Sequence, residues 1–448
     1  MSPAAIVSLL VVASVLLACV TAPTEVRARS ASGGGPPTAD RGLFGDTYPL
    51  EILPQVELVS AALSKTTWMD QWGPSGAGGN EYFQAMSKLL EPFRDHTAVK
   101  IAQRLNDRGF QYDAVPCFAC HLGPLPDLAL THEYSDYVAQ RAGGRQQLEE
   151  FRIALRSLAQ ESDFVGFLEE WRSYLEESVR ETSRGFEPDR IVTWLIAFYG
   201  EQPAEFHMIL APAMFSGGGY GATVYDSGKK LVYEIVRESG RGINRPEFPT
   251  GRSLGFLALH EWGHAFVNPA VQSAYEKAGG TLVNKLYSLY SPVSSRMSSM
   301  AYGNVRTFLC EQVLRGATAV GARELYGYSG YRWEMSTDES VGFYLTSFAV
   351  KQLREYSAQR DQYPAFADFV PYLLSKMADS GIRPGRQVDW YRVAGVAIVA
   401  CLASGFIFVT WGVPVYQRWR WFKKRGTPLT ASSAQMQDKQ PPERNTGS

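Results

Sequence analysis

The stretch His260-Glu261-Trp262-Gly263-His264 contains two histidines four positions apart, with a glutamate directly after the first. On a helix, side chains at this spacing project from one face about one turn apart, so both imidazoles could bind one ion. Glu261 then lies beside the ion, where it could take a proton from a water molecule. The stretch therefore predicts a zinc-dependent peptidase site, with His260 and His264 as Zn²⁺ ligands and Glu261 as general base.

The flanking residues predict a buried helix around this motif. Leu254 to Leu259 are apolar except for one glycine, and Asn268-Pro269 follows the second histidine. Because proline disrupts helices, we expect the helix to end there. The chain has 6 histidines in 448 residues, which makes a chance pair at this spacing less common than in a histidine-rich chain.

A catalytic zinc site needs a third protein ligand. The HExxHxxGxxH class is excluded, because Val267 and Ala270 occupy its glycine and third-histidine positions. A glutamate twenty residues beyond the second histidine is also excluded, because that position is Asn284.

Glu311 is the candidate that we favour, with Glu276 as the second choice. Glu311 lies within residues 305 to 322, an amphipathic stretch expected to pack beside the motif helix. A carboxylate among apolar residues needs a partner, since burying an isolated charge is costly. Zinc is one such partner, and a salt bridge to Arg315 at i+4 is the alternative. An oxyanion donor is also usual, and tyrosines 302, 326, 328 and 331 are unranked candidates.

The pattern of the central chain predicts a helix-rich α+β fold of zincin-like type, with a small sheet before the motif helix. Residues 146 to 159 have helical periodicity, as does an apolar stripe from Phe164 to Leu175 behind the N-cap candidate Asp163. Residues 206 to 212 and 230 to 237 are expected to be strands, with residues 217 to 221, rich in glycine, as a tight turn.

Both ends of the chain carry targeting features. Residues 1 to 22 resemble a signal peptide, and the sequence before Cys19 also resembles a lipoprotein signal, so the two alternatives stay open. Residues 23 to 43 read as a flexible linker before a folded domain at 44 to 390. Residues 393 to 415 form a 23-residue uncharged run, long enough to span a membrane. The basic residues at 416 to 448 predict a cytoplasmic, disordered tail, which places the catalytic domain outside the cytoplasm.

The composition suits a well-cored globular protein, with 45% hydrophobic residues and a net charge of -1. This charge gives no indication of nucleic-acid binding. We expect a peptide or protein substrate, and membrane lipid as the surroundings of the apolar run.

Three segments give the chain a resemblance to a known family. They are the HExGHxFVNP string from His260 to Pro269, the segment from Glu355 to Pro371, and Gly109 to Ala114. The chain resembles a bacterial family of unknown function that is predicted to contain zincin-like (gluzincin-type) metallopeptidases. The resemblance covers most of residues 90 to 375 and implies a metallopeptidase-like fold without a defined substrate. It also implies a glutamate on a helix where Glu311 stands.

Two alternatives remain from other classes of function. Cys117, Cys120 and His121 form a Cys-x-x-Cys-His sequence, the attachment signature of a c-type haem in an exported protein. A disulfide or two small buried side chains are the simpler interpretation of these cysteines. The chain could also be a catalytically inactive zincin-like binding module, although Glu261 between the two histidines favours an enzyme.

Overall fold

The computed structural model describes residues 50–72, 80–203, 205–215, 219–238, 247–300 and 302–384. These residues belong to one unit, which ends at Pro384. The signal peptide, the linker, the apolar run at 393–415 and the basic tail lie outside the described residues, so these expectations stay predictions. Within the described ranges, no helix has the length and apolar character needed to cross a membrane.

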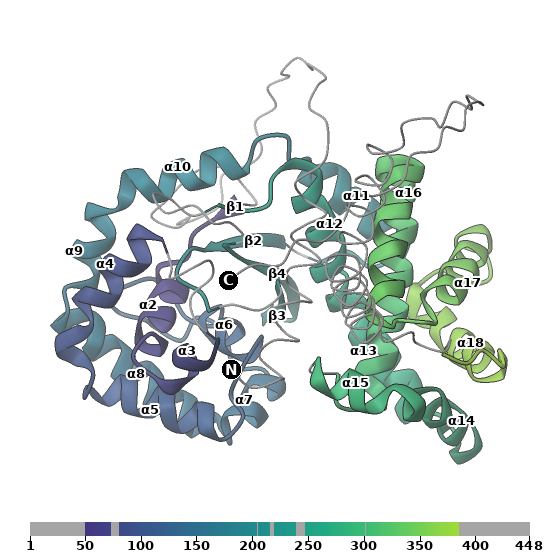
Figure 1. Cartoon of the computed structure of the whole chain (residues 1–448), viewed down its shortest axis with the longest axis horizontal. Coiled ribbons are helices and arrows are strands. Elements are labelled where there is room, and N and C mark those ends of the chain that lie inside the picture. The colour runs from purple at the N-terminus through teal and green to yellow at the C-terminus, as the bar shows by residue number, and fades with distance from the viewer. Residues whose placement is uncertain are drawn as a thin grey trace, which may run out of the picture. The chain divides into compact units, whose positions relative to one another are not determined.

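The first part of the chain is mostly helical (Figure 1). Its elements are β1 (Leu50–Glu51), α2 (Pro54–Leu63), α3 (Thr67–Trp72), α4 (Glu81–Leu89), the 3-10 helix η1 (Glu91–Phe93), α5 (Thr97–Asp107), α6 (Ala114–Ala119), α7 (Asp136–Ala142), α8 (Arg145–Glu161), α9 (Phe164–Glu170), α10 (Arg172–Thr182) and α11 (Pro188–Tyr199).

The second part contributes most of the sheet and the remaining helices. Its elements are β2 (Glu205–Ala211), β3 (Tyr220–Asp226), β4 (Lys229–Arg237), α12 (Gly251–Glu261), α13 (His264–Glu276), α14 (Gly280–Tyr290), the 3-10 helix η2 (Ser291–Val293), α15 (Ser294–Ser299), α16 (Val305–Val341), α17 (Thr346–Ala358) and α18 (Phe366–Asp379).

The sheet has four strands in the order β1-β2-β4-β3. β1, β2 and β4 are parallel, and β3 pairs antiparallel with β4. The central strand β4 is buried along most of its length, as expected for a parallel strand covered on both faces. In β3, at the edge, buried and half-buried residues alternate over its first five positions. The α+β prediction is therefore confirmed, with a small mixed sheet ahead of the motif.

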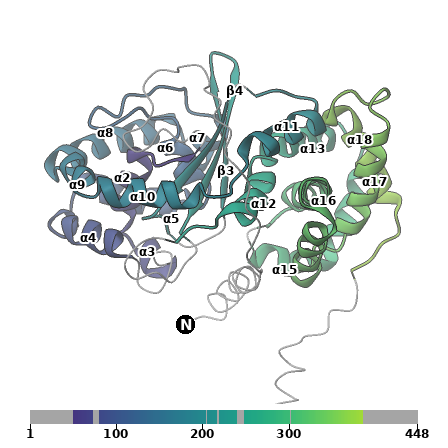
Figure 2. The same ribbon diagram turned by 90° about the horizontal axis from the view of Figure 1, so that it is seen from above.

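Helices lie on both sides of this sheet (Figure 2). The helices from α2 to α10 are on one side, with α6 against β3. On the other side, α12 packs on β3 and β4, and α13 packs on β3. The two histidines of the motif therefore belong to the layer on the second face.

Several local predictions are confirmed. Residues 146 to 159 lie in α8, and Asp163 caps α9 by accepting a hydrogen bond from the Gly166 amide. Phe164 and Leu175 are buried, although the expected single helix breaks at Trp171 into α9 and α10. β2 and β4 match the two expected strands within one residue at each end.

Two local predictions are wrong. Tyr220 and Gly221 are not part of a tight turn but begin β3, a third long strand. Pro269 does not end the motif helix, because α13 continues to Glu276 with Pro269 inside it. The boundary between two helices lies instead at Trp262 and Gly263, because α12 ends at Glu261 and α13 begins at His264.

α16 is a helical hairpin rather than one straight helix. Gly327 has φ 73° and ψ -168°, a conformation outside the helical region that glycine adopts readily. The Arg315 and Asp338 side chains are in contact although 23 residues separate them, a span of roughly 35 Å along a straight helix. The second half of α16 therefore runs back along the first half.

The segment from Glu355 to Pro371 has a structural role at the end of α11. Tyr356 Oη and Arg360 Nη1 both donate to the Phe198 carbonyl, at 2.8 and 2.7 Å. Gly200, in the left-handed region at φ 69°, ends the helix next to the Pro364 carbonyl. These contacts satisfy carbonyl groups that every helix C-terminus leaves open.

The imidazole of His207 on β2 should make the stability of the fold depend on pH. Its Nδ1 and Nε2 lie 3.0 Å from Glu51 and 3.0 Å from Glu205, and its ring stacks on Tyr233. Burial alone lowers the pKa of His207, but hydrogen bonds to the two carboxylates outweigh this effect and raise the pKa to about 9. The folded state therefore binds the imidazole proton more tightly than the unfolded chain does.

We expect the stabilisation from protonated His207 to be complete below about pH 6.5 and to be lost as the pH rises through about 9. His207→Gln should lower the free energy of unfolding by up to about 3 kcal/mol at pH 6, and by much less at pH 10. Urea unfolding of both proteins at the two pH values measures this difference. An equal loss at pH 6 and pH 10 would contradict the role of the charge.

Candidate metal centre

The two motif histidines are held one turn apart across the junction of α12 and α13. Trp262 and Gly263 keep helical angles, with φ and ψ of -66° and -28°, and -62° and -30°. The chain thus continues in its helical direction, and the rings of His260 and His264 lie 5.1 Å apart. The Trp262 side chain is fully buried, and its Nε1 donates to the His207 carbonyl on β2 at 2.9 Å. This bond fixes the junction to the sheet.

His260, Glu261 and His264 form a group that could hold a metal ion. One ligand atom from each side chain lies within 4.8 Å of the others. Glu261 is buried, and the two histidines are partly buried. A metal at this position would therefore be shielded from most of the solvent.

Glu311 reaches the same place from α16. Its Oε2 lies 3.8 Å from His260 Nε2, and its Oε1 lies 3.5 Å from His264 Nε2. The residue is 4% exposed, and Oε2 has no hydrogen-bond partner among the described residues. Each oxygen of this buried carboxylate thus faces one imidazole nitrogen, and Oε2 does so without accepting a hydrogen bond.

Arg315 contacts the Glu311 carboxylate but does not donate a hydrogen bond to its Oε2 atom. Arg315 Nε lies 3.3 Å from Glu311 Oε2, whereas Arg315 Nη1 donates to Asp338 at the shorter distance of 2.6 Å. The guanidinium also packs over the Phe343 ring at 3.9 Å from its centroid. Arg315 is therefore oriented chiefly by the second half of the α16 hairpin.

The electrostatic environment favours the protonation states that a metal site needs. Burial lowers the pKa of His260 well below its usual value, and the charges of Arg315 and His264 lower it further. The imidazole is therefore neutral, as metal binding requires. Burial raises the pKa of Glu261, opposed by the charge of His264. This shift moves Glu261 toward the range in which a carboxylate exchanges protons near neutral pH.

The backbone at Gly221 in β3, and at Gly219 just before this strand, passes close to Glu261, and at Gly221 a side chain would fit only if the structure shifted. A Cβ on Gly219 would lie 3.0 Å from Glu261 Oε1, and one on Gly221 would lie 2.7 Å from the Glu261 carbonyl oxygen. The Gly221 amide also lowers the pKa of Glu261 by hydrogen bonding. The sequence showed these glycines but gave no sign that they contact the motif, because their partner lies about forty residues away.

The structure does not bring Glu276 to the histidines. It ends α13, where its carboxylate contacts Gln272 and Arg306 at 2.9 and 3.5 Å. Among the four tyrosines, the hydroxyl of Tyr302 lies where Arg315 and Glu311 influence its pKa, which burial raises. Tyr326 instead lies against Gly255, and Tyr328 is 64% exposed.

The Cys-x-x-Cys-His segment lies at the end of α6, with Cys117 inside the helix, Cys120 as its C-cap and His121 directly after it. Cys117 and Cys120 are free thiols, each 3% exposed, and His121 is completely buried. Burial lowers the pKa of His121 to about 4. A haem needs open space beside both sulfur atoms and the histidine, so this burial argues against haem attachment.

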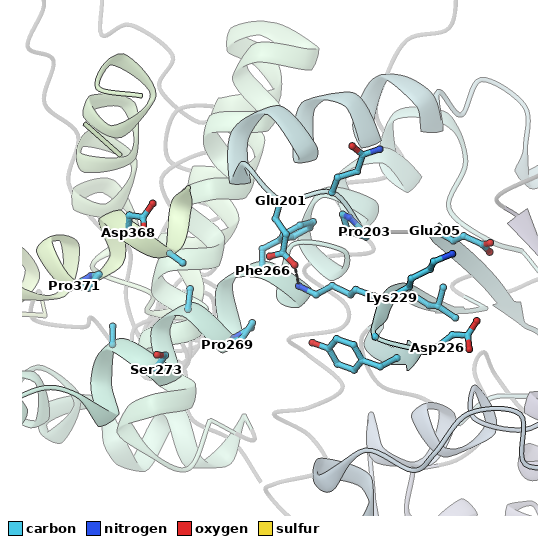
Figure 3. A pocket seen from close by; sticks show the side chains of 18 of the residues that line it. Glu201, Pro203, Glu205, Asp226, Lys229, Phe266, Pro269, Ser273, Asp368 and Pro371 are labelled. Atoms are coloured by element: carbon cyan, nitrogen blue, oxygen red, sulfur yellow. Dashed lines mark hydrogen bonds and ion pairs between the residues drawn. The ribbon is translucent and has the colours of Figure 1, made fainter. Parts of the chain in front are cut away.

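A pocket lies on another face of α13 (Figure 3). Phe266, Pro269 and Ser273 line it from α13, Glu201 lies across from them, and Asp368 comes from α18. His260, Glu261, His264 and Glu311 do not line this pocket. The pocket and the metal group are therefore separate features that share one helix.

Fold and site together define a helix-rich α+β protein with a buried His-Glu-His group that could hold a metal. Residues 76–376, more than half of the chain, match a family described as a domain of unknown function (DUF4932). The chain belongs to this family. No curated protein and no solved structure matches it.

Gly263 is expected to be required for the packing of α16 on the motif. A Cβ at this position would lie 2.6 Å from Leu314 Cδ1 and 2.7 Å from the Leu259 carbonyl oxygen. Gly263→Ala should lower the free energy of unfolding by about 1 to 3 kcal/mol, the usual cost of overpacking. Gly280→Ala is the matched control, because no atom lies within 4 Å of its added Cβ. Equal urea midpoints for Gly263→Ala and the unaltered protein would refute the packing argument.

Proposed function

We propose that the chain is a zinc-dependent metallopeptidase of the zincin type, anchored to a membrane with its catalytic domain outside the cytoplasm. The anchor and the location rest on the sequence of both chain ends. The catalytic part rests on one observation above all: the two carboxylate oxygens of the buried Glu311 face the Nε2 atoms of His260 and His264, one each, and Oε2 accepts no hydrogen bond among the described residues.

The donor set fits zinc. Two imidazole nitrogens and one carboxylate are ligands that catalytic zinc sites use, with a further position left for water or substrate. His260, His264 and Glu311 would hold the ion. When bound, zinc supplies Lewis acidity, which polarises a substrate carbonyl and makes a water molecule a stronger acid.

Glu261 is the proposed general base. It follows the first ligand directly and lies within 3.8 Å of His264 Nε2, but its carboxylate is turned toward β3. In amide hydrolysis the Glu261 carboxylate takes a proton from water as the water oxygen bonds to the carbonyl carbon. It then delivers this proton to the leaving nitrogen when the carbon–nitrogen bond breaks. The products are a carboxylic acid and an amine.

Tyr302 is the proposed donor to the developing oxyanion. Its hydroxyl lies beside the Arg315 guanidinium and within the influence of the Glu311 charge. A tyrosine hydroxyl is protonated at neutral pH and burial raises the pKa of Tyr302 further, so this hydroxyl can donate a hydrogen bond.

The third ligand can be tested by zinc affinity. We expect Glu311→Gln to weaken zinc binding by at least 10- to 100-fold, the range seen even for residues that only support a ligand. Glu276→Gln is the control and should bind zinc as the unaltered protein does, because Glu276 lies at the far end of α13. Competition with a chelating indicator measures both affinities. An unchanged affinity for Glu311→Gln would remove Glu311 from the ligand set.

The catalytic role of Glu261 can be tested with the purified full-length protein and a mixed peptide library. Glu261→Gln should keep zinc and lose about 10²- to 10⁴-fold in hydrolysis, as expected when a general base is removed. His264→Ala should lose zinc and activity together, and Tyr302→Phe should keep zinc with slower hydrolysis. Absence of zinc from the unaltered protein under metal-replete conditions would refute the proposal. Bound zinc without any hydrolysis would favour the binding-module alternative.

A further inference from the structure

The first turn of α13 lacks part of its normal hydrogen bonding. In an α-helix the Ala265 carbonyl would accept a bond from the amide of residue 269, but residue 269 is proline and has no N–H. The helix start is also irregular, because the Ala265 and Phe266 amides reach back only three residues, to Trp262 and Gly263. The segment that carries His264 is therefore weakly held by its own backbone.

Lys230 of β4 supplies the missing donor. Its Nζ donates to the Ala265 carbonyl at 3.2 Å, and it forms an ion pair with Glu201. The ammonium also lies over the Phe266 ring, 5.3 Å from its centroid. The Lys230 side chain is only 10% exposed and lines the same pocket as Glu201, Phe266 and Pro269.

We infer that Lys230 is a positioning residue for His264, and that it does so by replacing the helical hydrogen bond that Pro269 removes. This inference rests on the metal site of the proposed function. The residue bonded by Lys230 directly follows His264, so a shift of this turn moves the imidazole relative to His260 and Glu311. A metal site tolerates little displacement of its ligands, and partners that orient ligands commonly contribute 10- to 100-fold in affinity.

The burial of Lys230 argues for a specific role. A lysine ammonium is costly to desolvate, and here a carboxylate, a carbonyl and an aromatic face surround the Lys230 side chain in place of water. Lys229, the preceding residue, is exposed instead. Lys229 is therefore a matched control for Lys230, which donates a hydrogen bond to the Ala265 carbonyl of α13.

The experiment is a double-mutant cycle in the full-length protein, with zinc affinity as the readout. Lys230→Met keeps an unbranched apolar side chain one atom shorter and removes the donor, so zinc binding should weaken by about 10-fold or more. Lys230→Arg keeps a donor and should restore most of the affinity, and Lys229→Met should leave it unchanged. Pro269→Ala returns an amide to position 269, so that the Ala265 carbonyl regains its helical bond. In this background Lys230→Met should cost little or no zinc affinity.

Each outcome decides the inference. Unchanged zinc affinity in Lys230→Met overturns the inference. It is also overturned if Lys230→Met lowers zinc affinity by the same factor in the Pro269→Ala background as in the unaltered protein. If Lys230→Met does not fold, Lys230→Gln takes its place in the cycle, because glutamine is too short to reach the carbonyl. An unaltered protein that binds no zinc overturns the proposed function and this inference together. Zinc binding that is independent of Lys230 overturns this inference alone.

Discussion

The burial of the Glu311 carboxylate is the constraint on which the site depends. Burying a carboxylate that is 4% exposed is costly unless other groups compensate for the lost water, and the groups beside Glu311 are the two motif imidazoles and Arg315. The position of Glu311 depends on the hairpin in α16, because Asp338 from the returning half orients the Arg315 guanidinium. The closure of the site therefore requires α16 to fold back on itself at Gly327.

Close backbone packing brings β3 and α16 against the metal-binding motif. At Gly221, strand β3 passes Glu261 so closely that a side chain would fit only if the structure shifted, and Gly263 lets α16 approach the junction of α12 and α13. Trp262 ties that junction to β2 through the His207 carbonyl. The sheet edge, the motif and α16 are thus fixed relative to one another by small residues at the contacts and by one large anchoring residue.

Predictions from the sequence succeeded where they depended on local periodicity and chemistry. Neighbouring residues were enough to predict the helix around residues 146 to 159, the cap at Asp163, and the strands β2 and β4. They failed where a distant partner overrides the local signal. Pro269 was expected to end a helix, but Lys230 replaces the lost amide and α13 continues past it.

The sequence by itself determined that His260, Glu261 and His264 could together hold a metal, because their spacing fixes their relation on a helix. It also narrowed the candidates for a third ligand to Glu311 and Glu276, but it held no information on the distance of either carboxylate from the histidines. Only the tertiary structure decided which of the two carboxylates lies beside the imidazoles, since that depends on how α16 packs against α13. The strand β3 and the role of its glycines were decided in the same way, by contacts between residues far apart in the chain.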